Sequence, residues 1–260
     1  MDLKEYVHSL ATKGRSFFTE DEALKETGLS QIALKSALKR LKKKQEIASP
    51  QQGFFIIVPP EYESLQSLPP EQFIDGLMRH LKTPYYVGLI SAAQFYGAAH
   101  QKPQTFQVIA PKARRDLQVG RVKISFTRKS GSEQSTARQF NTPRGFVRVA
   151  DPATTAIDLV LFPQKAGGIS AVFEILSDLS EHIKVEFFKK EISQVKQAPL
   201  LQRLGYFFEI LNLEELAQLC EVQLKKQTYV RKTLLDPQEK PEGALLNSRW
   251  HLIINAELET

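Results

Sequence analysis

Residues 19–58 read TEDEALKETGLSQIALKSALKRLKKKQEIASPQQGFFIIV, and they predict the fold of the N-terminal region. Thr19 with Glu22 three residues later is a capping box, which predicts a helix that ends at Gly28. Ser30 caps a second helix. Three leucines of that helix recur at the spacing of a buried stripe: Leu34, Leu38 and Leu41. Two helices joined by a short turn are typical of the helix-turn-helix, whose second helix enters the major groove of DNA.

The second helix also carries a cationic face. Between Ser30 and Gln45 there is no acidic residue, and there are six basic ones: Lys35, Lys39, Arg40, Lys42, Lys43 and Lys44. On charge alone, a Lys-rich helix that contacts only water is the simpler interpretation. The capped helix before it and the hairpin signal after it favour DNA binding instead. We expect Gln31 and Ser36 to read base edges and the lysines to contact phosphates.

A hairpin is predicted directly after this helix. Residues 47–48 form its first strand, residues 50–53 its turn and residues 54–58 its second strand. Pro59 and Pro60 end the hairpin because proline has no N–H to donate to a sheet. A hairpin in this position is the wing of a winged helix. The predicted DNA-binding residues are Ser30, Gln31, Lys35, Ser36, Lys39, Arg40, Lys42, Lys43, Gln51 and Gln52.

The chain has 260 residues, enough for two domains. With a first helix over residues 3–11, a winged helix-turn-helix domain is predicted at residues 1–58. A linker and connecting helix follow at residues 59–84, and a C-terminal domain at residues 85–260. The predicted fold class is α+β, in which the larger domain is mixed α/β and mostly helical after Asp151, the predicted cap of its first long helix.

Weaker periodicity predicts further elements. Apolar residues at helical spacing predict one connecting helix over residues 70–81, and a short helix is predicted at residues 91–99. Strand composition occurs at residues 105–109, 122–126 and 146–149, and a short strand is predicted near the C-terminus within residues 245–254.

The formal net charge of +6 is unevenly distributed. Residues 102–149 carry 11 basic and 2 acidic side chains, whereas residues 150–260 carry 12 basic and 16 acidic ones. Three interpretations of the basic segment are open: an auxiliary phosphate-binding face, contact with an acidic protein surface, including the chain's own C-terminal third, or no role. The candidate auxiliary phosphate contacts are Lys112, Arg114, Arg115, Arg121 and Lys123.

Composition also bears on the cellular compartment. Cys220 is the only cysteine, which excludes an intramolecular disulfide and a cysteine-based metal site. The N-terminus has no signal-peptide pattern, and no apolar run approaches the length that spans a bilayer. We expect a soluble, cytoplasmic protein that does not bind membranes.

Sequence motifs of catalysis are absent. The five histidines form no metal-binding pattern, and no Gly-rich phosphate loop or GxSxG elbow occurs. The order of Asp158, Glu174, Glu186 and Lys189 resembles that of metal-dependent nuclease sites. However, Glu186 and Lys189 fall on one predicted helix, where an exposed i, i+3 pair is the simpler explanation. We therefore predict a protein that is not an enzyme and that holds no metal or cofactor.

Three later stretches, with the winged helix, resemble one known family. The first is YYVG, SAA and YG within residues 85–97, and the second is RVADPATTAID at residues 148–158. The third is NSRWHLIIN at residues 247–255, with LGY at residues 204–206 between the second and the third. Together they resemble the AbiEi-type antitoxins of bacterial type IV toxin–antitoxin systems, which act in abortive infection, a form of phage defence. The resemblance covers nearly the whole chain.

The resemblance implies a protein with two tasks. Its winged helix would bind repeats of double-stranded DNA in the promoter of its own operon and act as an autorepressor. Its C-terminal domain would counteract a cognate nucleotidyltransferase-like toxin, directly or indirectly. The alternative is a ligand-responsive winged-helix transcriptional regulator without a toxin partner. A DNA-modifying enzyme is a third hypothesis, which requires Asp158, Glu174 or Glu186 to converge around a metal.

Overall fold

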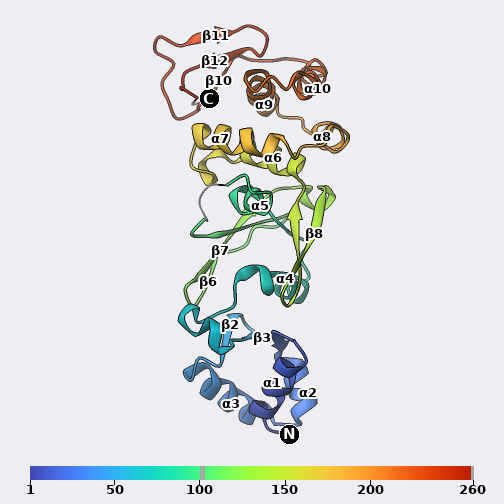
Figure 1. The fold of residues 1–260 in the computed structure, drawn as a ribbon, viewed down its shortest axis with the longest axis vertical. Coiled ribbons are helices and arrows are strands. Elements are labelled where there is room, and N and C mark those ends of the chain that lie inside the picture. Colours follow the sequence, from blue (N-terminus) through green and yellow to red (C-terminus); the bar gives the residue numbers. More distant parts are fainter. Residues whose placement is uncertain (100–102, 259–260) are drawn as a thin grey trace. The chain divides into compact units, whose positions relative to one another are not determined.

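The computed structural model describes residues 1–99 and 103–258 (Figure 1). Contacts between residues divide the chain into two compact units. The first unit contains residues 1–87, 104–133 and 139–148, and the second contains residues 88–103, 134–138 and 149–260. The N-terminal region and most of the central sheet thus share one unit. The predicted domain ranges are based on sequence composition and stay a prediction.

The first unit begins with three helices and a three-stranded sheet, an arrangement consistent with the predicted winged helix-turn-helix, which we call the winged-helix region. Its elements are α1 (Leu3–Thr12), β1 (Phe17–Thr19), α2 (Glu20–Thr27), α3 (Gln31–Lys43), β2 (Ile47–Gln51) and β3 (Phe54–Ile57). The strands form a sheet in the order β1-β3-β2, with both pairs antiparallel. The three helices and the hairpin agree with prediction, but β1 was not predicted because three residues are too few to show an alternating pattern.

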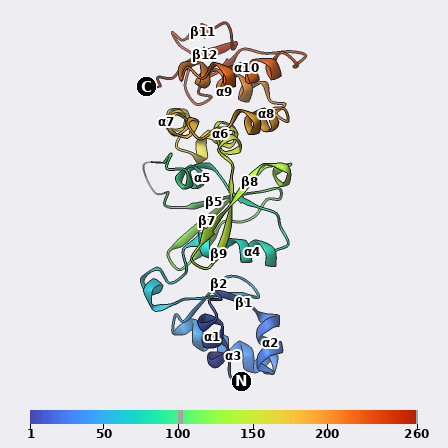
Figure 2. The same ribbon diagram turned by 45° about the vertical axis from the view of Figure 1, so that its right-hand side comes forward.

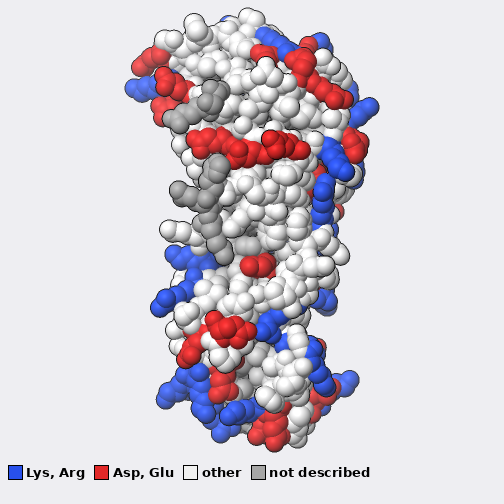
Figure 3. All heavy atoms as spheres, viewed as in Figure 1, with Lys and Arg blue, Asp and Glu red and all other residues white. Residues whose placement is uncertain are grey.

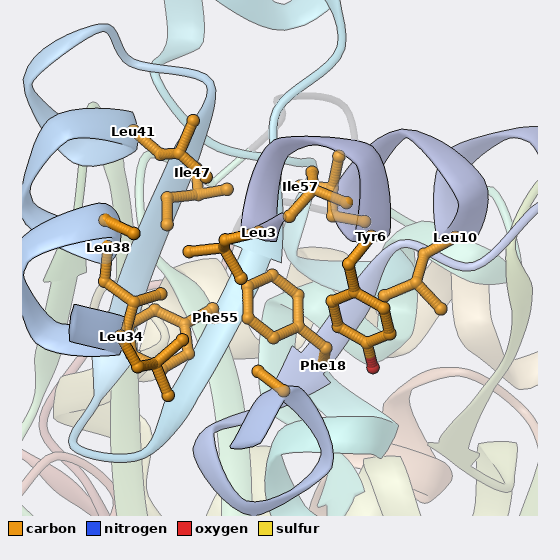
Figure 4. Packing of buried hydrophobic residues seen from close by; sticks show 13 residues of the cluster. Leu3, Tyr6, Leu10, Phe18, Leu34, Leu38, Leu41, Ile47, Phe55 and Ile57 are labelled. Carbon is orange, nitrogen blue, oxygen red and sulfur yellow. The ribbon is translucent and has the colours of Figure 1, made fainter. Parts of the chain in front are cut away.

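Aromatic packing holds the winged helix together (Figure 4). Phe18 of β1 is fully buried. The Tyr6 ring of α1 meets it edge-on at a centroid distance of 5.8 Å, and the Phe55 ring of β3 stacks on it at 5.3 Å. Burial of such a side chain stabilises a fold by roughly 2 kcal/mol. The unpredicted strand β1 therefore supplies the centre of this core.

The rest of the first unit contains most of a six-stranded sheet. Before it come two 3₁₀ turns, Pro60–Leu65 and Pro70–Gln72, and helix α4 (Ile74–His80). The strands are β4 (Tyr86–Val87), β5 (Phe106–Ala110), β6 (Leu117–Val119), β7 (Val122–Arg128), β8 (Ala137–Thr142) and β9 (Gly145–Ala150), and a 3₁₀ turn covers Ser132–Gln134. Their order is β6-β7-β5-β4-β9-β8.

Two predictions for this region need correction. The single helix over residues 70–81 is wrong, because the backbone of Phe73 has φ −134° and separates the 3₁₀ turn from α4. Strands β6 and β8 were missed. Both lie at the edges of the sheet, where a strand needs no continuous apolar pattern.

The second unit is mostly helical (Figure 2). Its helices are α5 (Leu89–Phe95), α6 (Pro152–Leu161), α7 (Ile169–Ser180), α8 (Val185–Ile192), α9 (Ala198–Ile210) and α10 (Glu214–Leu224), with a 3₁₀ turn at Pro163–Lys165. A three-stranded sheet follows, formed by β10 (Thr233–Leu234), β11 (Leu245–Asn247) and β12 (Leu252–Ile254). Asp151 caps α6 as predicted, since its side chain accepts a hydrogen bond from Ala153 N at 3.0 Å.

The predicted fold class is confirmed: the chain is α+β, and its C-terminal part is mostly helical. Within residues 1–99 and 103–258, no helix has both the length and the apolar character needed to cross a membrane.

Candidate nucleic-acid interface

Helix α3 has a buried face and an exposed face. Ser30 begins the helix, and its hydroxyl oxygen accepts a hydrogen bond from Ala33 N at 3.3 Å. The buried face packs into the winged-helix core and consists of Leu34, Ala37, Leu38 and Leu41. The opposite face is exposed, so the predicted leucine stripe fixes which side chains of α3 point to solvent.

The exposed face of α3 is cationic (Figure 3). On the face drawn there, Lys and Arg side chains gather at the lower left, over α3. Five predicted DNA-binding cations are exposed: Lys35, Lys39, Arg40, Lys42 and Lys43. None of them forms an ion pair with another residue that the structure describes. Cations without carboxylate partners are available to neutralise phosphates, and this neutralisation releases the counterions condensed on DNA.

A groove separates α3 from the wing. Its lining consists of Lys35, Leu38, Lys39 and Lys42 of α3, Ser49, Gln52, Gly53 and Phe55 of the wing, and Glu20 of α2. Lys42 Nζ lies 5.0 Å from the centroid of the Phe55 ring, a cation–π distance. The structure thus brings three predicted lysines of α3 and one predicted glutamine of the wing to the same groove.

The other predicted residues of α3 lie beyond this groove. A second hollow runs along the far side of the helix and is lined by Ala33, Ser36, Lys39, Arg40 and Lys43. Gln31 is exposed in the first turn, and Gln51 is half-buried at the base of the wing turn. Lys39 borders both hollows, so it lies at the centre of the cationic face.

The wing turn is held by contacts that the sequence did not reveal. Gly53 has φ +75°, a conformation that glycine adopts without strain. Its carbonyl oxygen accepts a hydrogen bond from Glu20 N at 2.9 Å. His80 of α4 lies on the other side, with Nε2 3.3 Å from the Gln52 carbonyl oxygen and its ring 5.5 Å from the Phe54 ring. His80 is therefore a positioning residue for the wing.

Helix α4 also packs closely on the wing sheet. A Cβ atom at Gly76 would lie 2.4 Å from the Phe17 ring, so only glycine fits at this position. Phe17 in turn stacks on Phe54 at a centroid distance of 5.1 Å. The predicted connecting helix is thus a support for the wing within the first unit.

Two arginines of the basic segment 102–149 make contacts within the chain, one with a hydroxyl group and one with a carboxylate. Arg114 is half-buried and donates to Thr83 Oγ1 at 2.8 Å. Arg144 forms an ion pair with Glu61 at 3.3 Å. The other four candidate phosphate contacts have exposed side chains: Lys112, Arg115, Arg121 and Lys123. Arg114 therefore stabilises its own loop, whereas the side chains of the other four residues are accessible to solvent.

The RVADP stretch builds a buried junction in the second unit. Asp151 is fully buried and accepts a hydrogen bond from Arg138 Nε at 2.7 Å, in addition to capping α6. Tyr96 donates from its hydroxyl to the Ala150 carbonyl oxygen at 2.8 Å. Burial raises the pKa of the Tyr96 hydroxyl above its ordinary value, and the charge of Asp151 raises it further. These residues fix the start of α6.

The NSRW stretch is anchored by a second set of contacts. Arg249 donates to Glu209 Oε2 at 2.8 Å, to Glu214 Oε1 at 2.7 Å and to Glu221 Oε2 at 3.0 Å. Its guanidinium lies 4.9 Å from the centroid of the Trp250 ring. Trp250 is fully buried, and its Nε1 donates to Glu209 Oε2 at 2.9 Å.

The geometry does not support a metal-dependent nuclease. Among the residues that the structure describes, no group of three or more His, Cys, Asp or Glu side chains is placed to hold a metal ion. Asp158, Glu174 and Glu186 all belong to this part of the chain, so they do not converge as that hypothesis requires. The lone thiol, Cys220, is buried, and its burial raises its pKa.

Comparison with known proteins identifies the region after the winged helix. Residues 86–210 match a family model described as the AbiEi antitoxin C-terminal domain. The chain carries an AbiEi antitoxin domain. The resemblance inferred from the sequence is confirmed over these residues, and the match supports an antitoxin role in a type IV toxin–antitoxin system.

The fold itself has a solved counterpart. The crystal structure of the RV2827C protein from Mycobacterium tuberculosis is similar, with a TM-score of 0.68 and 16% sequence identity, over 95% of this chain and 89% of that chain. At this identity the similarity shows the fold alone. No curated protein sequence matches the chain.

The NSRW stretch lies outside the residues matched to the AbiEi domain but is packed onto them. A Cβ atom at Gly205 of α9 would lie 2.1 Å from the Trp250 ring. The glycine of the LGY stretch therefore leaves room for this ring. Glu209 of the same helix holds both Arg249 and Trp250. The C-terminal sheet is therefore packed on the AbiEi domain through Arg249, Trp250 and Gly205.

Proposed function

We propose that this chain is an autorepressing antitoxin. Its winged helix binds double-stranded DNA in promoter repeats of its own operon, and its AbiEi domain counteracts a nucleotidyltransferase-like toxin. The observation that best supports DNA binding is the exposed face of α3, whose cations have no carboxylate partner in the described part of the chain. Three of these cations line a groove beside the wing. None of these steps needs a catalytic group, a metal or a cofactor from this chain.

The proposed contacts divide by side-chain chemistry. Lys35, Lys39 and Lys42 contact phosphates along the groove, because ammonium groups attract phosphate at any base sequence. Gln31 and Ser36 approach base edges, since their side chains donate and accept hydrogen bonds. The remaining proposed contacts are Arg40 and Lys43 on α3, Gln51 and Gln52 on the wing, and Lys112, Arg115, Arg121 and Lys123 as auxiliary phosphate contacts.

DNA binding is tested with the duplex that lies immediately upstream of the chain's own coding sequence. Fluorescence anisotropy compares its affinity with that of a scrambled duplex of equal length and base composition. We expect tighter binding to the upstream duplex, and transcription from that promoter should fall when the protein is supplied. Equal affinity for the two duplexes would contradict the promoter-binding proposal.

The antitoxin task is tested separately from repression. The proposal predicts a neighbouring gene that encodes a nucleotidyltransferase-like protein. That gene is expressed from an unrelated promoter, and growth is measured with and without this chain. We expect the full chain to restore growth. The variant with Lys35→Ala and Lys39→Ala should restore it equally, because the proposal assigns antitoxicity to the AbiEi domain. Loss of rescue in this folded variant would show that DNA binding is part of toxin neutralisation.

A further inference from the structure

Ile32 is an apolar residue on the cationic face of α3. Its side chain is 81% exposed, a larger fraction than for any other large hydrophobic residue that the structure describes. It is in the first turn of α3, which begins at Gln31. Because an α-helix has 3.6 residues per turn, Ile32 belongs to an outward-facing line with Ser36, Lys39 and Lys43, opposite the buried leucines.

This isoleucine contributes nothing to the winged-helix core, which contains the leucines of the other face. It also adds nothing to phosphate binding, because an aliphatic side chain carries no charge or donor. Exposure of one hydrophobic residue is common by itself. Here, however, the residue is next to Gln31 and shares a line with Ser36, the two side chains proposed to read base edges. The position is one that would face a base edge if α3 enters the groove.

The major groove offers one apolar feature among its donors and acceptors, the C5-methyl group of thymine. Residues in the N-terminal part of a recognition helix are those that reach base edges. We propose that Ile32 contacts the C5-methyl group of a thymine and so determines specificity at that base pair. This inference rests on the proposed function, in which α3 lies in the major groove of promoter DNA.

Removal of the methyl group tests the contact from the DNA side. The probe is the upstream duplex, prepared once with thymine and once with deoxyuridine at every thymine position. Deoxyuridine keeps the base pair and lacks only the methyl group. Four affinities are measured by fluorescence anisotropy at one salt concentration: the unaltered protein and Ile32→Ala, each with both duplexes.

We expect deoxyuridine to weaken binding of the unaltered protein by roughly fivefold, in line with the burial of about one methyl group. Ile32→Ala should weaken binding to the thymine duplex by a similar factor and should respond less than the unaltered protein to deoxyuridine. The matched control is Val222→Ala, which truncates another exposed aliphatic side chain on α10. It should bind both duplexes as the unaltered protein does. Circular dichroism verifies that Ile32→Ala is folded.

Two results overturn the inference. The first is unchanged affinity of Ile32→Ala for the thymine duplex. The second is the same loss with deoxyuridine in both proteins, since the methyl group and Ile32 would then act independently. Failure of the proposed function looks different: the unaltered protein would bind the upstream and scrambled duplexes equally. If the four affinities agree with the inference, single thymine-to-deoxyuridine changes along the duplex identify the base that Ile32 contacts.

Discussion

The chain uses basic side chains in two opposite ways. On α3, Lys35, Lys39 and Lys42 are exposed along a groove and have no ion-pair partner among the described residues. In the C-terminal region, Arg249 is held by the carboxylates of Glu209, Glu214 and Glu221 and lies over the Trp250 ring. Charge alone therefore does not indicate function. The surroundings of each cation decide whether it is available to a ligand or stabilises the fold.

The cations of the two regions also differ in their electrostatic interactions with the rest of the chain. Like charges on neighbouring turns of α3 repel one another, although those in its last turn interact favourably with the helix dipole. A binding partner with negative charge relieves this repulsion. Arg249 gains its neutralising charges within the chain, so its removal should affect stability and leave DNA binding unchanged.

The largest expected effect is on DNA affinity. Changing Lys35 and Lys39 to Ala removes two proposed phosphate contacts and should weaken binding to the upstream duplex by about 30-fold at physiological salt. Both side chains are exposed, so the free energy of unfolding should hardly change. Anisotropy titration and urea denaturation measure the two quantities. A large loss of stability with unchanged affinity would mean that Lys35 and Lys39 stabilise the fold and do not bind DNA.

The next effect concerns the contact between Gly205 and Trp250. Gly205→Ala places a methyl group against the buried ring and should lower the free energy of unfolding by about 2 kcal/mol. Affinity for the upstream duplex should not change once the protein is folded. Gly76→Ala is the matched control, because it creates the same kind of clash against Phe17 beside the wing. That variant should lose DNA affinity, and equal affinity in both variants would argue against support of the wing by α4.

A smaller effect is expected at Arg249, with a characteristic pH dependence. Hydrogen bonds from Arg249 hold the pKa of Glu214 below its ordinary value of 4.5, and hydrogen bonds from Lys225 and then Arg249 do the same for the pKa of Glu221. A carboxylate with a lowered folded-state pKa stabilises the fold above its unfolded-state pKa, and this stabilisation is lost as the pH falls. Arg249→Met should therefore be less stable at pH 7 and lose less stability between about pH 5 and pH 3.

Denaturation at a series of pH values measures this difference. Lys232→Met serves as a control, since Lys232 is an exposed cation in the same unit without a described ion pair. Its stability should follow that of the unaltered protein at every pH. Parallel curves of stability against pH for Arg249→Met and the unaltered protein would mean that Arg249 does not lower the pKa of Glu214 and Glu221.

The smallest expected effect is at His80. His80→Ala removes the contacts with Gln52 and Phe54 and leaves the wing turn held by Glu20 N. A less ordered wing should weaken binding to the upstream duplex about threefold, while α3 keeps its own contacts. His182→Ala, in the second unit, provides the control. Equal affinities for His80→Ala and the control would show that the wing does not need this support.

The sequence predicted the winged helix well because its signals are local. Thr19, Glu22, Gly28 and Ser30 mark helix ends within a few residues, and Gly53 marks the hairpin turn. The features it missed depend on contacts between distant segments. His80 and Gly76 support the wing from α4, and no periodicity in residues 70–81 indicates what that helix touches.

The candidate site was predicted in part. The cations follow directly from composition, whereas their separation into a wing-side groove and a far-side hollow needed the packing of Phe55 and Leu38. Ile32 was missed because an aliphatic side chain has neither the charge nor the hydrogen-bonding groups that indicate DNA binding in a sequence. Its place outside the leucine stripe was the available signal. For Arg249 the resemblance indicated the stretch, but its carboxylate partners come from two helices that sequence alone does not bring together.

The most direct test of the role of α3 is the salt dependence of DNA binding. The logarithm of the association constant for the upstream duplex is measured against the logarithm of salt concentration for three proteins: the unaltered chain, the Lys35→Ala and Lys39→Ala variant, and Arg249→Met. We predict that the double variant reduces the slope by about 2, one unit for each lost phosphate contact, and that Arg249→Met leaves it unchanged. Equal slopes for the double variant and the unaltered chain would contradict the assignment of α3 as the DNA-binding helix.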